Sequence, residues 1–554
     1  MAKEITYQPL PDIGLNGLNT QSNPATLDHS WLTKAENIVL RESGRITFRK
    51  GLKQKVAPNG SDAAIVSMVE HNDQGTNKIF ASYGTSIYTV DFTTPAAAFP
   101  TGDDDTKHTV GSSTGDWQFV NFNKKLDAFH AGIVPQRYDG ALSDDSMWAA
   151  YDNAHRPSSV SSGEFKPSCG MGYYGRMWVG GVAAEKDVVY YSTLLDSDDF
   201  RTTAENGASN GGYIDLKTVW GTDEVVAIAP YFGKLVIFGK NNIAIYDSPD
   251  VIASIALNEV IRGVGLVSRD TVQAIGDDLV FLSNTGLRSF ARTTEKDKLP
   301  LTDLSVNIKD RLIRNIGQST NVKSVYVENE GIYIMSFVDK NINYVFDFKH
   351  ITPNEAPRVT TWTFDNDREP ASMIYTDLYS GLLVGQKDGS IAGYEQWYDT
   401  DLAGASTYTD ASYTWSLETV WVNLGESIAA SLLKRLFMVL EGGSGATMGL
   451  KWYKDFSVTP STTTSIVLNP VTTGTTSLWG ASSSLYGATT ATHTHVAGTH
   501  PSNSTYAPVF GLREYRTPLT GSAKNIKLAI DIESNGFDAS LQDLTLLHKQ
   551  GKIR

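Results

Sequence analysis

The feature that most constrains this chain is a pair of short apolar segments that recurs along it. In YFGKLVIFGKNNIAIYD (Tyr231 to Asp247), an apolar run is followed by the polar turn Gly-Lys-Asn-Asn and by a second apolar run that ends in Tyr-Asp. Two apolar runs joined by a short turn of Gly and Asn are typical of a β-hairpin. About seven such stretches occur in the sequence. The others are Asn77 to Asp91, Asn123 to Asp139, Tyr174 to Ser192, Gly276 to Phe290, Asn329 to Asp347 and Tyr379 to Glu395.

The spacing of the hairpins favours a β-propeller. Successive copies start roughly 45 to 57 residues apart, which suits one four-stranded propeller blade. A lone hairpin is only marginally stable in water, whereas radially stacked sheets bury both faces. A β-sandwich and a β-helix are the alternatives, but the spacing is irregular for a sandwich and long for a β-helix rung. We predict an all-β chain with a propeller over residues 61–400, in which Gly239, Asn241 and Gly286 supply the positive φ of tight turns.

One helix is expected within the propeller region. In PLTDLSVNIKDRLIRNIG, apolar residues recur at every fourth position, as on one face of an α-helix. Thr302 or Asp303 suits the N-cap, and Gly317 suits the end. We expect this helix to pack between blades rather than to bind a partner. Its apolar positions are Leu304, Ile308, Leu312 and Ile316.

The composition changes near residue 401. Several later segments alternate apolar and polar residues, which is typical of antiparallel strands with one buried face. We predict a C-terminal β-sandwich-like domain at 401–554 with few short helices, and an extended surface loop over its Ser/Thr/Gly-rich stretch at 457–508. Residues 1–60 are expected to form an extended docking segment. The alternating segments are Ser412 to Glu426, Lys434 to Phe456, Lys524 to Ser534 and the closing SLQDLTLLHKQ.

Length, charge and cysteine content narrow the class of protein. A chain of 554 residues exceeds the size of one hydrophobic core. The net charge of −14 disfavours a protein that wraps nucleic acid over its whole surface, because phosphate neutralisation needs an excess of Lys and Arg. It is compatible with DNA sliding through an acidic channel. Cys169 is the only cysteine, and the sequence has no signal peptide or long apolar run. We therefore expect a soluble protein that folds in a reducing cytoplasm.

Catalytic motifs are missing from the sequence. GKLVIFGKN has the wrong spacing for a P-loop, and there is no G-x-S-x-G, H-E-x-x-H or paired-cysteine motif. Glycosidase chemistry needs two facing carboxylates, and two Asp clusters offer them, although solvated loops and turn caps explain both clusters better. We predict no enzymatic activity, no catalytic residue and no cofactor. The clusters are Asp103, Asp104 and Asp105, and Asp196, Asp198 and Asp199.

Two further sets of side chains invite a binding role. THTHVAGTH has metal-like spacing at His493, His495 and His500, because alternate residues of a strand point to one side and symmetry could gather copies. A polar loop with incidental histidines is the alternative, so these remain weak metal candidates. Five tryptophans lie in or beside strand-like text, and we expect them to pack between blades rather than to stack on sugars. They are Trp117, Trp178, Trp220, Trp362 and Trp397.

Both ends and the middle of the chain carry a family resemblance. The text GLNTQSNPATLDHSWLTKAENIVLRESGRITFRKGLKQ (Gly17 to Gln54) resembles the opening of tail nozzle (tail tubular protein B-like) proteins of short-tailed bacteriophages. The middle, GLVSRDTVQAIGDDLVFLSNTGLRSFART followed by LTDLSVNIKDRL, is similar to the propellers of phage virion stabilisation and nozzle proteins. The closing HKQGKIR resembles their basic C-terminal tails.

The resemblance implies a structural virion protein at the distal end of a podovirus-like tail. Such a protein is assembled in the host cytoplasm as a homohexameric ring. It docks on tail adaptor ring proteins, meets tail fibre or spike proteins, retains the genomic DNA and gates its ejection. The basic segment Arg41 to Lys55 would then either contact an acidic neighbouring ring through Arg45, Arg49 and Lys50, or close the propeller as a β-strand. The alternatives are a carbohydrate-binding or glycan-cleaving propeller used in host recognition, and a cellular scaffold propeller.

Overall fold

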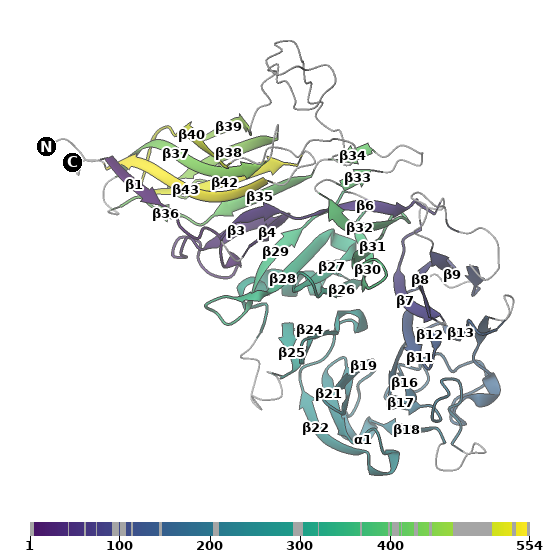
Figure 1. Cartoon of the computed structure of the whole chain (residues 1–554). Coiled ribbons are helices and arrows are strands. Elements are labelled where there is room, and N and C mark those ends of the chain that lie inside the picture. Colours follow the sequence, from purple (N-terminus) through teal and green to yellow (C-terminus); the bar gives the residue numbers. More distant parts are fainter. Residues whose placement is uncertain are drawn as a thin grey trace, which may run out of the picture. The chain divides into compact units, whose positions relative to one another are not determined.

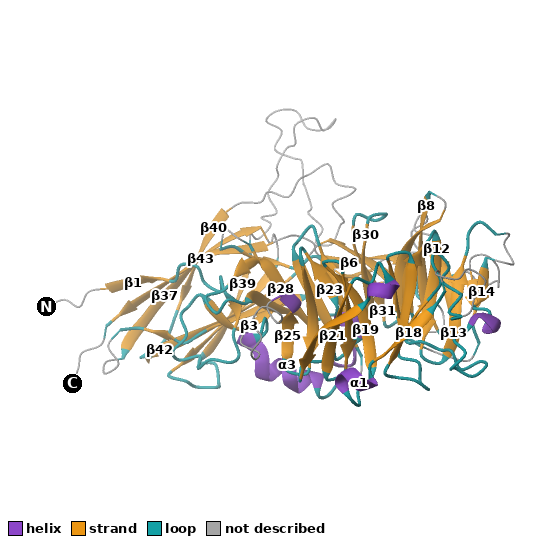
Figure 2. Ribbon diagram, turned by 90° about the horizontal axis from the view of Figure 1, so that it is seen from below, coloured by secondary structure: helices purple, strands orange, loops and turns teal. Residues whose placement is uncertain are grey.

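In the computed structural model, nearly all the regular secondary structure is β-strand, with a few short helices (Figure 2). The chain folds into two compact units. Unit 1 comprises residues 1–53, 358–362 and 395–554, and unit 2 comprises residues 54–357 and 363–394. The structure describes residues 5–41, 44–59, 63–73, 75–90, 99, 107–111, 115–142, 147–202, 210–291, 303–319, 321–365, 368–396, 399–401, 409–411, 413–425, 430–442, 446–468, 512–534 and 539–550.

Unit 2 is a β-propeller made of small antiparallel sheets that follow one another along the chain (Figure 1). The first three are β7 (Ser67–Asp73), β8 (Thr76–Tyr83), β9 (Ser86–Val90) and β10 (Lys107–Thr109); β11 (Gln118–Phe122), β12 (Lys125–His130), β13 (Ile133–Tyr138) and β14 (Trp148–Ala150); and β15 (Cys169–Tyr173), β16 (Arg176–Gly180), β17 (Val188–Tyr191) and β18 (Gly212–Asp215). The others are β19 (Val225–Tyr231), β20 (Lys234–Gly239), β21 (Asn242–Asp247) and β22 (Ala256–Arg262); β23 (Gln273–Ile275), β24 (Asp278–Ser283) and β25 (Gly286–Ser289); β26 (Val322–Val327), β27 (Ile332–Phe337) and β28 (Ile342–Ile351); and β30 (Pro370–Thr376), β31 (Gly381–Gln386) and β32 (Ile391–Gln396).

The predicted hairpin repeat is confirmed copy by copy. Each of the stretches identified in the sequence forms a hairpin, and each hairpin lies in a different sheet. The first strands of the sheets lie side by side in the order β23, β26, β30, β7, β11, β15 and β19. One apolar cluster joins the sheet of β19 to the sheet of β23. The contact between β30 and β7 joins the last sheet to the first. The chain therefore closes into a ring of sheets, as a propeller requires.

The last sheet is completed by a strand from the opposite end of the sequence. β6 (Gly51–Val56) pairs with β32, and its residues from Gln54 onward belong to unit 2. Val56 is buried in the same apolar cluster as Leu383 and Ile391. Of the two roles predicted for the basic segment Arg41 to Lys55, closure of the propeller is thus the one that the structure confirms for this strand.

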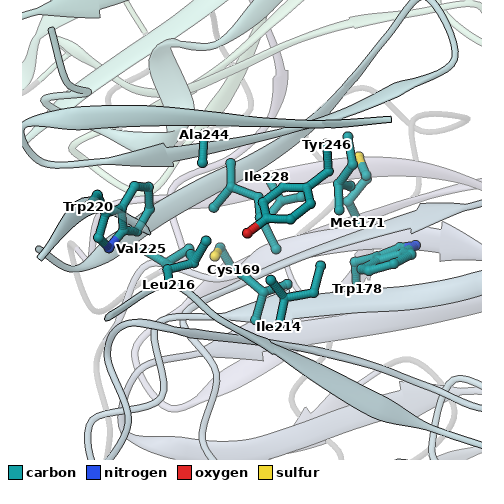
Figure 3. Close-up of a cluster of buried hydrophobic side chains, with 13 residues drawn as sticks. Cys169, Met171, Trp178, Ile214, Leu216, Trp220, Val225, Ile228, Ala244 and Tyr246 are labelled. Atoms are coloured by element: carbon teal, nitrogen blue, oxygen red, sulfur yellow. The ribbon is translucent and has the colours of Figure 1, made fainter. Parts of the chain in front are cut away.

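Neighbouring sheets are held together by apolar side chains that interleave between them. Between sheets β15–β18 and β19–β22, Trp178 and Ile214 of the first sheet face Ile228 and Tyr246 of the second (Figure 3). Cys169 lies in the same cluster, where burial raises the pKa of its thiol to about 12. A thiol in this setting packs as a small apolar side chain and is not reactive.

The predicted helix is confirmed with a later start. A 3-10 turn, η6 (Val306–Ile308), leads into α3 (Lys309–Ile316), and the N–H of Gly317 bonds to the carbonyl of Ile313. The N-cap prediction is wrong for Asp303, because the N-caps are Ser305 for η6 and Ile308 for α3, and Thr302 lies outside the described residues. The carboxylate of Asp303 instead accepts the backbone N–H of Ser305 at 2.8 Å. The only other α-helix in the described part of the chain is α1 (Lys217–Trp220).

The turn prediction is correct for Gly286 but wrong for Gly239 and Asn241. Gly286 has φ 128°, whereas the other two residues do not have a positive φ. The carboxylate of Asp223 accepts the backbone N–H groups of Lys240 and Asn241 at 3.1 and 3.0 Å. A side chain therefore stabilises this turn, and no left-handed residue is needed there.

Unit 1 contains two larger sheets whose strands come from distant parts of the sequence. In the first, the strand order is β4-β5-β43-β37-β40, with β1 on β43 and β41 on β37. The bounds are β1 (Ile5–Pro9), β4 (Ile38–Leu40), β5 (Ile46–Phe48), β37 (Ser431–Gly442), β40 (Leu512–Pro518), β41 (Ser522–Ala523) and β43 (Ala539–Lys549).

The second sheet of unit 1 includes a strand from the middle of the chain. Its order is β29-β2-β3-β35-β42-β38-β39, with β36 on β42. The bounds are β2 (Gly17–Leu18), β3 (Trp31–Glu36), β29 (Pro357–Trp362), β35 (Thr414–Thr419), β36 (Val422–Asn423), β38 (Thr447–Lys454), β39 (Thr462–Val467) and β42 (Asn525–Glu533). A separate two-stranded ladder joins β33 (Asp399–Asp401) and β34 (Thr409–Ala411).

These sheets change the domain boundaries expected from sequence. A self-contained C-terminal β-sandwich at 401–554 is not confirmed, because strands from residues 5–48 occupy positions in both sheets. For the same reason, residues 1–60 are not a separate extended segment. The loop predicted at 457–508 is wrong for Thr462–Val467, since this β-branched stretch pairs with β38. The remainder of that loop from residue 469 lies outside the described residues.

Candidate functional site

Four charged side chains meet at the centre of the propeller. Asp116 precedes β11, Arg269 and Asp270 lie in the 3-10 turn η5 (Arg269–Thr271) before β23, and Lys323 lies on β26. Lys323 Nζ contacts Asp116 and lies 2.8 Å from Asp270 Oδ2. Arg269 lies 3.1 Å from the carboxylate of Asp116 and 3.3 Å from that of Asp270. We call this set the central quartet.

Burial and charge pairing act against each other in the central quartet. Burial alone would raise the pKa of Asp270, but Lys323 and Arg269 hold it well below its ordinary value. Burial raises the pKa of Asp116, and the nearby Asp270 adds to this effect despite the two cations. Asp116 is also the most open member, because 40% of its side chain is exposed, against 7% for Lys323. The quartet is thus a balanced network of two cations and two anions.

Asp116 and Arg269 of the quartet are also held by groups from other sheets. Ser67 on β7 donates its hydroxyl hydrogen to Asp116 at 3.0 Å. Arg269 donates to the backbone carbonyl of Ser168 and, at 2.6 Å, to that of Asp116. The network therefore ties together strands of several blades at the axis, and we expect it to resist rearrangement.

The central quartet lies between two cavities. One has a volume of about 190 Å³ and is lined by β7, β11, β23, β26 and β30 together with Asp270 and Lys323. The other has a volume of about 430 Å³ and is lined by Asp116, Arg269 and residues of the next sheets. Because the quartet contributes to both linings, the axis of the propeller is crossed by charged side chains.

A second buried carboxylate lies between two blades. Asp127 on β12 is fully buried, and Tyr151 and Ser197 donate to its Oδ1 at 2.8 and 3.0 Å. Its other oxygen, Oδ2, has no hydrogen-bond partner in the described structure. Burial raises the pKa of Asp127 to about 7, although both hydroxyls favour the ionised form. Such a pKa makes this carboxyl sensitive to pH near neutrality.

An exposed apolar patch covers the turns at one end of two neighbouring sheets. Its members are Tyr174, Leu194, Leu195 and Phe232, which are 47–67% exposed. The N–H of Leu195 bonds to the carbonyl of Gly175 at 2.7 Å, next to Tyr174. A Cβ at Gly233 would lie 3.6 Å from the hydroxyl of Tyr174, so the turn that contains Phe232 and Gly233 lies next to Tyr174. We call these four residues the turn patch.

Of the two acidic clusters named from the sequence, the one that the structure describes serves local structure. Asp196 faces Arg137 at 3.4 Å, Asp198 accepts the N–H of Asp152 at 3.0 Å, and Asp199 forms two contacts with Arg201. The structure does not bring these carboxylates together around an open site. Asp103, Asp104 and Asp105 lie outside the described residues, as do His493, His495 and His500.

Two of the three basic partner-contact candidates, Arg45 and Arg49, have partners within unit 1. Arg45 binds Glu441 at 2.5 Å and Ser540 at 3.1 Å. Arg49 is fully buried, with its guanidinium 4.0 Å from the ring centre of Tyr413. The prediction is therefore wrong for Arg49, because a buried guanidinium cannot meet a partner. The partner role of Lys50 stays a prediction.

The tryptophan prediction is confirmed for Trp117, Trp178 and Trp220, which are buried in apolar clusters between blades. It is wrong for Trp362, which is buried on β29 in unit 1, and Trp397 lies outside the described residues. Within the described ranges, no group of three His, Cys, Asp or Glu side chains is arranged to hold a metal ion. No described helix is long and apolar enough to span a membrane.

Sequence reasoning missed the central quartet and the turn patch. The quartet residues are far apart in sequence and match no motif, although each precedes or begins the first strand of a hairpin, as in GDWQFV and NVKSVYV. The turn patch had a usable signal, because Tyr-Gly and Phe-Gly occupy hairpin turns where Asn-Gly is the common choice.

No protein-family model and no curated protein matches this chain. Among solved structures, the chain is similar to the WD40 domain of Pan2 from Neurospora crassa. The match has a TM-score of 0.38 and 6% sequence identity, and it covers 62% of this chain and 96% of that domain. A likeness at this level carries no functional information.

Proposed function

We propose that this chain is a structural virion protein that forms the tail nozzle of a short-tailed phage. In this proposal several copies form a ring-shaped channel that retains the packaged DNA and opens for its ejection. Both ends and the middle of the sequence resemble phage tail nozzle proteins, which form such an assembly. The turn patch is the observation that carries the proposal, since it is a surface suited to contact with another protein.

The turn patch has properties that favour a protein contact. Large apolar side chains that gather on a surface mark interaction sites more often than single exposed ones do. Tyr174, Leu195 and Phe232 also have φ values of 47°, 63° and 43°. A left-handed backbone costs a non-glycine residue roughly 1–2 kcal/mol. Bulky apolar residues are thus present where Asn or Gly would be more stable, which suggests selection for contact rather than for folding.

The two ends of the same sheets differ in character. The turns at the other end, residues 181–187 and 240–241, contain Lys186 and Lys240. These two turns contain no large exposed apolar residue. Val251, in the loop that joins β21 and β22, is 50% exposed and lies at the same end as the turn patch. This difference between the two ends of the sheets supports the end with the turn patch as the contact surface. We propose that a neighbouring copy of the chain covers the turn patch.

The central quartet bears on the route of the DNA. A channel along the propeller axis would have to break four ion pairs between buried or partly buried groups, which is costly. In the proposed assembly the DNA therefore passes between subunits arranged in a ring, and not through any single propeller. The acidic net charge of the chain suits such a channel, because it prevents the DNA from sticking.

The test removes the turn patch without weakening the fold. In the double variant Leu195→Asn and Phe232→Asn, Asn tolerates the left-handed backbone. We expect an unchanged or higher free energy of unfolding, while oligomers seen by native mass spectrometry for the unmodified chain are lost. Tyr213→Asn is the matched control, since Tyr213 is 58% exposed outside the patch. Oligomers that persist in the double variant would contradict the role of the patch.

A further inference from the structure

The larger cavity opens beside the central quartet and carries an unusual set of charges for an acidic chain. Its volume is about 430 Å³, within the range of small-molecule pockets. Two lysines, Lys186 and Lys240, lie in its lining with side chains 59% and 60% exposed. Arg269 and Asp116 of the quartet contribute to the same lining, and so does Glu224. Three cations therefore face two carboxylates in this cavity.

The two lysines share one counter-ion. Lys186 Nζ lies 3.0 Å from Glu224, and Lys240 Nζ contacts the other oxygen of the same carboxylate. The adjacent Asp223 is outside the lining, and its carboxylate binds the backbone N–H groups of Lys240 and Asn241 instead. Two ammonium groups on one carboxylate leave a positive charge that a second anion can neutralise.

Arg269 offers a further donor. A guanidinium has five N–H donors. It donates three hydrogen bonds, to Asp270 and to the backbone carbonyls of Ser168 and Asp116. Its contact with the carboxylate of Asp116 is an ion pair. Nη1 and Nη2 each donate one of these bonds, so each has one further N–H. The side chain of Arg269 is only 12% exposed and lines the cavity, so a group inside the cavity can accept a hydrogen bond from it.

We propose that this cavity binds the phosphate group of a small molecule. A tetrahedral phosphate accepts hydrogen bonds from several directions, which suits a guanidinium combined with two flexible ammonium groups. The apolar part of the lining, Ala131, Ala183, Val225 and Val226, leaves room for a short carbon chain. This site is independent of the proposed assembly role.

The proposal is tested by calorimetric titration of the full-length chain with inorganic phosphate and with glycerol phosphate. Titration with chloride at matched ionic strength measures non-specific screening. We expect saturable binding of both phosphates and none of chloride. In the double variant Lys186→Gln and Lys240→Gln, two charge-assisted hydrogen bonds are lost, so binding should weaken about tenfold or more. The control, Lys124→Gln with Lys217→Gln, removes the same charge from other surface positions and should bind as the unmodified chain does.

A steric variant tests the same cavity without changing its charge. Ala183 is exposed in the lining, so Ala183→Trp should fold normally and fill the space. We expect it to abolish phosphate binding while the melting temperature stays unchanged. Equal binding by the unmodified chain, the lysine variant and the tryptophan variant would overturn the proposal, as would equal responses to phosphate and chloride.

Discussion

At the scale of single residues, the structure places its most consequential charges where the sequence shows no motif. Asp116, Arg269, Asp270 and Lys323 come from three separate parts of the chain and meet only when the propeller closes. A pattern of spacing cannot reveal such a group, because its members are neighbours in space alone. The turn patch is different, since its Tyr-Gly and Phe-Gly turns are visible in the sequence.

Removal of one charge from the central quartet should destabilise unit 2 strongly. Lys323→Met leaves Asp116 and Asp270 with only Arg269 as a counter-ion, and breaking a buried ion pair costs about 3–5 kcal/mol. Urea denaturation measures this loss. Lys217→Met is the matched control, because Lys217 is 66% exposed and lies 3.7 Å from Asp187, so its pair should contribute about 0–1 kcal/mol. Equal effects of the two substitutions would show that the quartet does not stabilise the fold.

The buried Asp127 should make stability depend on pH near neutrality. Its pKa is raised to about 7 in the folded protein, whereas an unfolded Asp titrates near about 3.9. The folded state thus holds the proton more tightly. The stabilisation from this proton is complete below about pH 4 and is lost as the pH rises through about 7.

The variant Asp127→Asn isolates this contribution. Because Asn does not titrate, the stability of the variant relative to the unmodified chain should rise by about 2–3 kcal/mol between pH 5 and pH 8. Urea denaturation at the two pH values measures the difference, and other titrating groups cancel in the comparison. A relative stability that does not change with pH would show that Asp127 is ionised throughout this range.

At the scale of elements, hairpins could be predicted and long-range pairings could not. Each repeat contains its own turn and its own two apolar runs, so local sequence determines the hairpin. β2, by contrast, is only Gly17–Leu18, and it joins β3 and β29 by parallel pairing. No local signal identifies so short a strand. The division into units follows from such pairings, so the sequence alone does not place the N-terminal strands in the same sheets as the C-terminal ones.

Closure by β6 can be tested at a single buried position. Val56 packs in one cluster with Leu383 and Ile391, so Val56→Asp would bury an unpaired charge there. We expect a loss of about 3 kcal/mol or more, with faster hydrogen exchange in β32 than in β20. Val251→Asp is the control, since Val251 is 50% exposed. An undisturbed β32 in the Val56 variant would mean that β6 is not needed to complete the sheet.

At the scale of the whole molecule, the proposed function depends on assembly. In this proposal, the family resemblance implies a ring, the turn patch would contact a neighbouring copy, and the central quartet would keep the DNA away from the propeller axis. None of these observations requires a catalytic group, which agrees with the local structural roles of Asp196, Asp198 and Asp199. A carbohydrate-binding propeller would use the same fold, but it would not need an apolar surface for self-association.

The native mass of the purified chain, together with negative-stain class averages in the same buffer, tests the nozzle proposal most directly. We expect a ring with a central hole and a mass of about 362 kDa, six copies of the 60.4 kDa chain, either for the protein alone or after addition of the adaptor ring. A chain that stays at 60.4 kDa in both conditions, with no ring in the images, would contradict the proposal.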